Sequence, residues 1–183
     1  MTLSPNAGSE SRVLYCVVCA APPALHVRSL VKLAQAQDWD VCVVMTPTAA
    51  RWLDADHSEL EELTGHLVRS TYKLPGQPDV LPPPSAILVA PATCNTINKW
   101  ALGISDTLAL GLITEGIGKG LPLVALPFLN RAQAAHPAFP RSVAVLREAG
   151  VNVLLGPDGY EPHGPGEAQP HAFPWSQALA ALH

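Results

Sequence analysis

The chain has 183 residues, of which 48% are hydrophobic and 14% charged, and its 11 basic and 15 acidic side chains give a net charge of −4. This length predicts one compact domain with a sizeable core. The mild acidity excludes the basic footprint of a protein that binds nucleic acid or an anionic membrane.

Five apolar runs are predicted to be buried strands, at residues 13–19, 41–45, 86–90, 123–126 and 151–155. The predicted helices cover residues 25–38, 48–52, 58–63, 93–102, 106–114, 138–149 and 176–182. Strands that alternate with helices predict an α/β fold, a doubly wound, Rossmann-like or flavodoxin-like parallel sheet with helices on both faces.

The domain boundaries follow from composition. We expect a disordered tail over residues 1–12, the folded domain over 13–155, and a Gly- and Pro-rich flap with a short helix over 156–183. The polar start does not resemble a secretory signal, and no apolar run reaches the ~20 residues that span a bilayer. A cytoplasmic protein is therefore expected.

The four cysteines also indicate a reducing compartment, because three of them lie in apolar runs. Cys16 and Cys19 form a C-x-x-C pattern, but residues three apart on a strand point to opposite faces. We interpret them as core residues rather than as a redox or zinc pair.

Ligands of doubly wound sheets bind beyond the carboxyl ends of the strands, which here are the loops at residues 20–24, 46–52, 91–95 and 127–130. The loop at 91–95 joins a buried strand to a helix through small residues, and the free N–H groups of a helix N-terminus attract anions and carbonyl oxygens. From spacing alone, an ordinary capped turn explains this loop better than a binding site does.

Two motifs carry a resemblance to a known family. The run Pro91-Ala-Thr-Cys-Asn-Thr, followed by Ala101-Leu-Gly-Ile-Ser-Asp-Thr-Leu, resembles the P-A-S-A-N-T and A-x-G-I-x-D-x-L motifs of the flavoprotein family of FMN-dependent cysteine decarboxylases. Residues 127–134 are similar to a second motif of that family, P-x-M-N-x-x-M-W. The family includes phosphopantothenoylcysteine decarboxylase and the lantibiotic peptidyl-cysteine decarboxylases.

The resemblance implies a function and a set of site residues. It implies FMN bound between the subunits of a homotrimer or higher homo-oligomer, and flavin-mediated oxidation and decarboxylation of a cysteinyl peptide or small molecule. It assigns a catalytic contact with the substrate carboxylate to Asn95, and substrate contacts to Leu129 and Asn130. The implied cofactor-binding residues are Ala21, Pro22, Thr46, Trp52, Pro91, Ala92, Thr93, Cys94, Asp106 and Phe128.

Three features depart from the family pattern. Gln77 stands where the family has an active-site His, and an amide cannot exchange a proton near neutral pH. Leu129, Gln133 and Ala134 replace the Met, Met and Trp of the second motif. The first loop is Ala21-Pro22 rather than a Gly-Ser-like pair, and proline lacks a backbone donor.

These departures leave alternatives open. The chain could be a non-catalytic flavin-binding, regulatory or interaction subunit that keeps the fold, or a domain for another phosphate-bearing ligand. Flavin prenylation would need a Gly-Ala-Ser first loop, which is absent. The flap, residues 156–171, also lacks the cysteine that decarboxylases of the coenzyme A pathway place there.

The remaining candidates are weak. Residues 116–120 lack the spacing of a phosphate-binding Walker loop and are predicted to be a connecting loop. His57 and His66 are expected to be solvated, and His136 to be half-exposed in a loop. His163 and His171 lie in a segment without periodicity, and no metal site is predicted.

Overall fold

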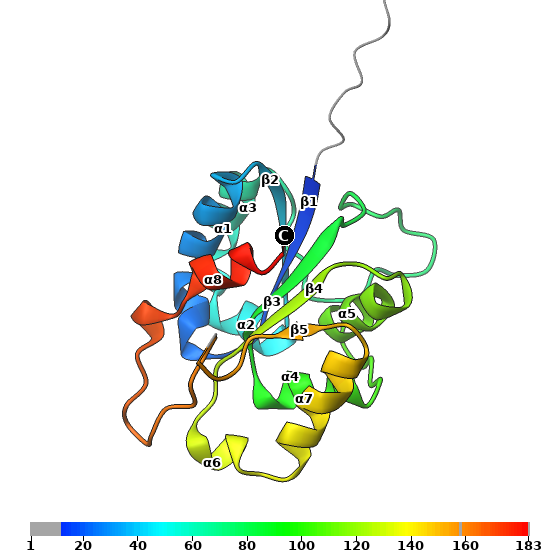
Figure 1. Ribbon diagram of the computed structural model, residues 1–183. Helices are drawn as coiled ribbons and strands as arrows, with labels where there is room; N and C mark the ends of the chain where they lie inside the picture. The colour runs from blue at the N-terminus through cyan, green and yellow to red at the C-terminus, as the bar shows by residue number, and fades with distance from the viewer. Residues whose placement is uncertain (1–11, 158, 183) are drawn as a thin grey trace, which may run out of the picture.

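The computed structural model describes residues 12–157 and 159–182 (Figure 1). Five strands form one sheet: β1 (Arg12–Val18), β2 (Trp39–Met45), β3 (Ala86–Ala92), β4 (Leu123–Pro127) and β5 (Asn152–Val153). Every strand pair is parallel, and the strand order is β2-β1-β3-β4-β5. This order confirms the predicted doubly wound, flavodoxin-like α/β fold.

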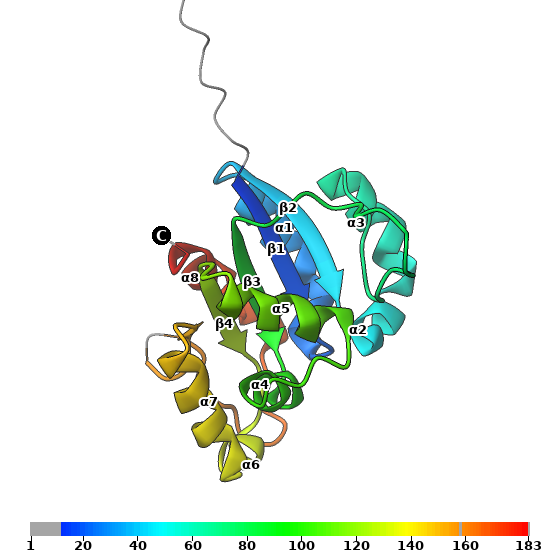
Figure 2. The ribbon, with the colours of Figure 1, turned by 90° about the vertical axis from the view of Figure 1, so that its right-hand side faces the viewer.

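Helices cover both faces of the sheet (Figures 1 and 2). One face carries α1 (Val27–Gln35), α3 (His57–Thr64) and α8 (Trp175–Ala180). The other carries α4 (Cys94–Ala101), α5 (Leu108–Gly118) and α7 (Ala138–Glu148). Short elements complete the chain: α2 (Pro47–Trp52), α6 (Arg131–Ala134) and the 3₁₀ turns η1 (Pro22–His26), η2 (Asp54–Asp56) and η3 (Pro170–Ala172).

The core is divided by the sheet into two apolar clusters, because alternate residues of a strand point to opposite faces. Leu14 and Cys16 belong to the cluster under α1 and α8, whereas Tyr15 and Cys19 belong to the cluster under α4, α5 and α7. The expectation that Cys16 and Cys19 face opposite sides is therefore confirmed, and all four cysteines are free.

Several predicted boundaries were wrong, and each has a local cause. Arg12 lies in β1, in register with Trp39, rather than in a disordered tail; residues 1–11 of that predicted tail lie outside the described residues. Helix α2 begins at Pro47, one residue earlier than predicted. The N-cap is Thr46 rather than Thr48, because the Thr46 side chain accepts a hydrogen bond from Ala49 N.

Helix α5 is also shifted from its predicted bounds. It begins at Leu108 because the Thr107 side chain accepts from Leu110 N, and it ends at Gly118. The prediction of a connecting loop at residues 116–120 was thus wrong for the first three positions. A Cβ added at Gly116 would lie 2.9 Å from a methyl group of Leu123, so the missing side chain lets the helix pack closely on the sheet.

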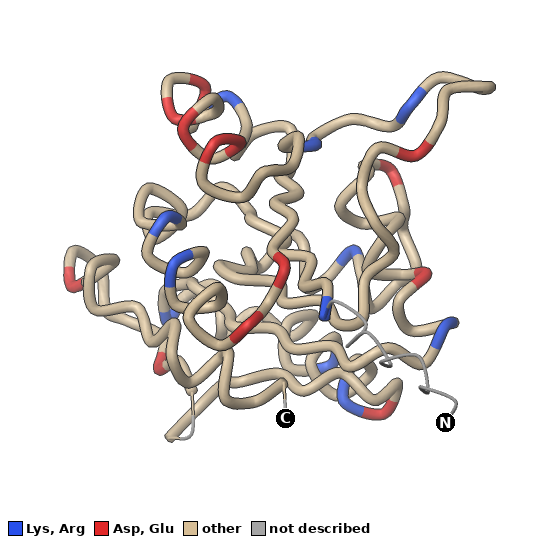
Figure 3. The backbone as a smooth tube through the Cα atoms, turned by 90° about the horizontal axis from the view of Figure 1, so that it is seen from above, with Lys and Arg blue, Asp and Glu red and all other residues tan. Residues whose placement is uncertain are grey.

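Basic and acidic residues are both distributed over many parts of the backbone (Figure 3). His66 Nε2 lies 2.7 Å from Asp40 Oδ1, so the expectation of a solvated imidazole was wrong there.

Within residues 12–157 and 159–182, no helix is long and apolar enough to cross a membrane. The same residues contain no cluster of three or more metal-ligating side chains.

Candidate functional site

A cavity of about 300 Å³ lies at the carboxyl ends of β1, β3 and β4. The chain leaves β1 toward α1 on one face of the sheet and leaves β3 toward α4 on the other, which is the topological switch point at which ligands of such sheets bind. The cavity is lined by Ala20, Ala21, Pro22, Thr93, Cys94, Asn95, Phe128, Leu129, Asn130, Gln133, His163 and Ala168.

The loop after β1 supplies a small, mostly apolar wall. Cys19 N donates to Pro91 O (3.1 Å) and Ala21 N donates to Cys19 O (2.8 Å), which fixes this loop against the end of β3. Pro22 begins η1, a position where the missing N–H costs no hydrogen bond. This wall therefore offers shape rather than donors to a ligand.

The loop after β3 supplies backbone donors. Thr93 Oγ1 accepts from Thr96 N (3.2 Å) and caps α4. The Thr96 hydroxyl lies 3.0 Å from Thr93 Oγ1 and accepts from Cys19 Sγ (3.3 Å), so the Thr93 hydroxyl belongs to a buried structural network. The N–H groups of Cys94 and Asn95 lie in the first helical turn, where no intrahelical acceptor exists, and both residues line the cavity.

Cys94 is a neutral thiol rather than a thiolate. Burial raises the pKa of the Cys94 thiol, and the hydrogen bond from Asn98 Nδ2 (3.5 Å) opposes this only in part. Its role at the cavity wall is consequently that of a small, polarizable surface.

The loop after β4 carries the second motif. Phe128 N donates to Ala92 O (2.9 Å), which aligns the two motif loops side by side. Asn130 and Gln133 form a capping box on α6, in which Asn130 Oδ1 accepts from Gln133 N (2.9 Å) and Gln133 Oε1 accepts from Asn130 N (3.3 Å). Asn130 therefore has its Nδ2 amide left to offer a ligand.

The C-terminal segment, defined here as residues 159–174, forms the fourth wall. Arg131 N donates to His163 O (2.9 Å), and Asn130 pairs with His163 in an isolated parallel bridge. The Phe128 ring lies 5.1 Å from the Tyr160 ring, 5.0 Å from the His163 ring and 5.7 Å from the Phe173 ring, measured between centroids. This aromatic cluster holds the segment against the second motif.

The structure thus brings together eight of the sequence-predicted site residues: Ala21, Pro22, Thr93, Cys94, Asn95, Phe128, Leu129 and Asn130. Pro91 and Ala92 are buried in the end of β3, behind this lining. Motif reasoning missed His163, although the aromatic residues around it were a signal that the segment packs on the domain.

The other four predicted residues do not line this cavity within one chain. Thr46 caps α2, and the Trp52 side chain is 48% exposed at the end of that helix. Asp106 pairs with Lys99 (2.5 Å) on the surface. Gln77 lies in the exposed Pro-rich loop, where its Oε1 accepts from Leu74 N (2.9 Å).

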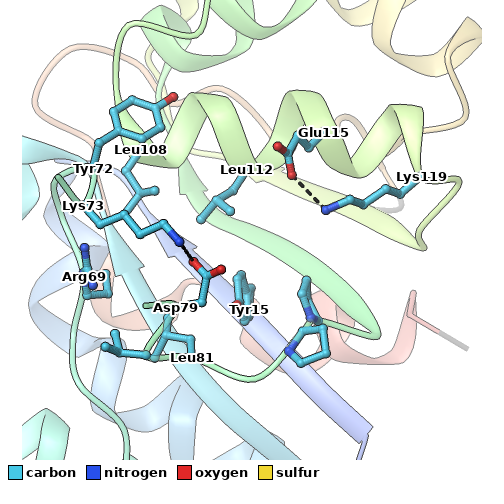
Figure 4. A pocket seen from close by; sticks show the side chains of 13 residues that line it. Tyr15, Arg69, Tyr72, Lys73, Asp79, Leu81, Leu108, Leu112, Glu115 and Lys119 are labelled. Carbon is cyan, nitrogen blue, oxygen red and sulfur yellow. Dashed lines mark hydrogen bonds and ion pairs between the residues drawn. The ribbon is translucent and has the colours of Figure 1, made fainter. Parts of the chain in front are cut away.

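A larger cavity, of about 490 Å³, lies between the Pro-rich loop and α5 (Figure 4). Four of its charged groups pair within their own segments, Lys73 with Asp79 (2.6 Å) and Lys119 with Glu115 (2.8 Å). The fifth, Arg69, donates to the carbonyl of Thr71 (3.1 Å). At its base, Tyr15 Oη donates to Pro82 O (2.8 Å), and burial raises the pKa of Tyr15 to about 12. Of the motif residues only Leu108 lines this cavity, whereas the residues of the first and second motif loops meet at the carboxyl ends of the strands, so the cavity there is the candidate site.

Comparisons with known proteins identify the relatives of this chain. A family model described as Flavoprotein matches residues 5–172. The coenzyme A biosynthesis bifunctional protein CoaBC of Bacillus subtilis is 32% identical over 135 residues, which are 70% of this chain and 32% of that protein. A cysteine/cysteine sulfinic acid decarboxylase from an unknown prokaryotic organism is 36% identical over 67 residues, 37% of this chain and 18% of that protein.

The chain thus spans a third or less of the length of these curated relatives. Among solved structures, the peptidyl-cysteine decarboxylase EpiD superposes with a TM-score of 0.71 at 22% identity, over 93% of this chain and 97% of the other. At this identity the likeness establishes a shared fold.

Proposed function

The chain belongs to the flavoprotein family, as its two motifs predicted, and from this we propose that it binds FMN and decarboxylates a substrate with a cysteine-derived side chain. The observation that carries the proposal is the cavity in which the loops of both motifs meet, residues 93–95 and 128–130. The names of the similar proteins, among them cysteine and peptidyl-cysteine decarboxylases, support the choice of chemistry.

The residues around the cavity fit a flavin. Phe128 and Leu129 offer an apolar wall for a ring system, and the backbone N–H groups of Cys94 and Asn95 offer donors for its carbonyl oxygens. A volume of about 300 Å³ is at the small end of the range for ligand sites, so FMN would extend beyond this cavity. Bound FMN would supply a two-electron oxidant for the carbon–sulfur side chain of the substrate.

The chain's own residues would bind and orient the substrate. Asn95 and Asn130 line the cavity from the loops after β3 and β4, and their amides would hold the substrate carboxylate. The neighbouring apolar wall of Phe128 and Leu129 excludes water, which favours the loss of a charged carboxylate as neutral carbon dioxide. Asn95 is thus proposed as a catalytic residue and Asn130 as a substrate-binding one.

We also propose that the functional unit is a homo-oligomer, with a trimer as its basic unit. Trp52 and Gln77 are exposed and outside the cavity of their own chain, so any contact they make with FMN or substrate would be in the site of a neighbouring copy. Analytical ultracentrifugation tests this arrangement: a monomer that binds FMN in full would contradict it.

The experiment that tests the function has two steps. The protein is purified without added cofactor, its absorption spectrum is recorded, and any released ligand is identified by mass. It is then incubated with a peptide that ends in cysteine, and the peptide is examined by mass spectrometry. We expect flavin bands, an FMN mass, and loss of carbon dioxide and two hydrogens from the peptide.

One alternative is favoured by a specific observation, the position of Gln77 away from the cavity. A chain that binds FMN but leaves cysteinyl peptides unchanged would be a flavin-binding subunit without chemistry of its own. A colourless protein that also fails to take up added FMN would contradict both possibilities.

A further inference from the structure

The candidate site has a histidine that neither motif contains. His163 comes from the C-terminal segment and lines the same cavity as Cys94 and Asn95. Among the described residues of the lining, His163 is the one with an imidazole, the side chain suited to proton exchange near neutral pH, because the others carry alkyl groups, amides, a hydroxyl, an aromatic ring and a partly buried thiol.

The position of His163 is fixed from three sides. Its carbonyl accepts from Arg131 N (2.9 Å), its ring lies 5.0 Å from the Phe128 ring, and its Nδ1 is hydrogen-bonded to Tyr160 Oη. Among the described residues, no hydrogen bond is made to Nε2. A ring nitrogen oriented by a bond at the other nitrogen is the arrangement that general acid–base catalysis requires.

We infer that His163, oriented by Tyr160, is the proton-transferring residue of this site and takes the role that Gln77 cannot perform. The inference rests on the proposed function, since it assumes a cysteine-derived substrate and FMN as the oxidant. It relocates the acid–base group from the loop before β3 to the C-terminal segment.

The protons and electrons of the proposed oxidation and decarboxylation balance. His163 Nε2 accepts the proton of the substrate thiol, and the carbon next to sulfur loses a hydride, for which bound FMN would supply the two-electron acceptor. The carboxylate then leaves as carbon dioxide, and its bonding electron pair forms the new carbon–carbon double bond and leaves a thiolate on sulfur. The imidazolium returns its proton to that thiolate, so the enzyme residue ends as it began.

Among the described residues, no buried charged group faces the His163 imidazole. From its own segment it faces the Tyr160 phenol, and burial raises the pKa of that phenol, so Tyr160 is neutral at neutral pH. Across the cavity lies the neutral Cys94 thiol. On the α6 side Arg131 lies 3.9 Å from Glu167, and both side chains are largely exposed.

The test uses the 183-residue chain loaded with FMN, the substitution His163→Gln and the matched control His171→Gln, which alters an exposed imidazole of the same segment. We expect His163→Gln to lower kcat with a cysteinyl peptide about 100-fold or more, the usual size of general acid–base catalysis. KM and FMN affinity should change little, added imidazole should restore part of the rate, and His171→Gln should match the unsubstituted protein.

A second readout does not depend on turnover. The imidazole NMR signal that disappears in His163→Gln should shift when FMN is added, whereas the signal lost in His171→Gln should not. Tyr160→Phe keeps the ring but removes the hydroxyl, and it should move the acidic limb of the kcat–pH profile.

The outcomes separate this inference from the function on which it rests. A protein without FMN affinity overturns both. If the unsubstituted protein converts the peptide and His163→Gln does so equally well, the inference is wrong and the function stands. If FMN binds without any change in the His163 signal, the inference is wrong whether or not peptide is converted.

Discussion

The two sides of the candidate cavity are built in different ways. The motif loops at residues 93–95 and 128–130 are held by backbone hydrogen bonds between neighbouring strands and by side-chain caps of α4 and α6. The C-terminal segment is held mainly by packing of aromatic rings, with few backbone bonds to the domain. The first side is attached directly to the ends of β3 and β4 and is rigid, whereas the second depends on one cluster of side chains.

This difference suggests a division of tasks. A rigid side suits the binding of a cofactor, because its donors need no reorganisation. The C-terminal segment, which is attached through aromatic rings, can adjust to a substrate. It carries His163, the residue proposed to transfer a proton. Phe128 belongs to both, because its backbone N–H bonds to Ala92 and its ring contacts the C-terminal segment.

The largest effect is expected from removing that shared residue. Phe128→Ala should lower the free energy of unfolding by about 3–5 kcal/mol, the cost of truncating a buried phenylalanine. It should also expose residues 159–174 to proteases before the rest of the domain. Urea denaturation and limited proteolysis measure both, with Val145→Ala on the exposed face of α7 as the control. A decrease in the free energy of unfolding below about 1 kcal/mol would mean that the aromatic cluster does not hold the C-terminal segment against the motif loops.

A pair of caps tests the rigid side by itself. Thr93 and Thr107 cap α4 and α5 in the same way: each Oγ1 accepts a hydrogen bond from the backbone N–H three residues later, at 3.2 and 3.3 Å. Each substitution by Ala should lower the free energy of unfolding by about 1 kcal/mol. Only Thr93→Ala should weaken FMN binding, because only Thr93 lines the cavity. Equal FMN affinities in the two variants would show that the α4 terminus is no part of the flavin site.

The pH dependence of Cys94 alkylation tests whether the thiol is partly buried at the motif-loop side of the cavity. Because burial raises the pKa of Cys94, less thiolate is present at any given pH than in an ordinary cysteine. Alkylation by iodoacetamide, followed by mass spectrometry, should therefore accelerate at a higher pH than for a free cysteinyl peptide, and FMN should slow it. A normal pH profile would indicate a solvated thiol and a more open cavity than the one described.

The smallest effect is expected at the other cavity. Lys119→Ala removes an exposed ion pair with Glu115 and should change the free energy of unfolding by at most about 0.5 kcal/mol. FMN affinity should stay the same. Weaker FMN binding in this variant, measured by fluorescence titration, would assign the flavin to the cavity beside α5.

The parts of this site that were predicted from the sequence are those whose structure depends on local residues. The apolar runs predicted the strands, and parallel order predicted that the loops after β1, β3 and β4 meet. The resemblance to the family then named eight residues of these loops, and the structure places them in the lining of one cavity. The cap at Thr46 and the capping box at Asn130 were missed, although both have short-range signatures.

His163 could not be predicted in the same way. Its place depends on contacts between residues 159–174 and Phe128, about 35 positions apart in the chain, and the segment has no periodicity that would fix its path. Aromatic residues without a repeating pattern indicate that a segment packs on the domain, but they do not indicate which part of the domain it contacts.

The most direct measurement is a titration of FMN into a protein whose cavity is filled. Asn95→Trp places a large ring at an exposed lining position, while Leu102→Trp places one at a 75% exposed position just after the end of the same helix. We expect quenching of flavin fluorescence to saturate for the unsubstituted protein and for Leu102→Trp, and to be lost for Asn95→Trp. FMN affinity that is undiminished in Asn95→Trp would contradict the placement of the flavin at the carboxyl ends of β1, β3 and β4.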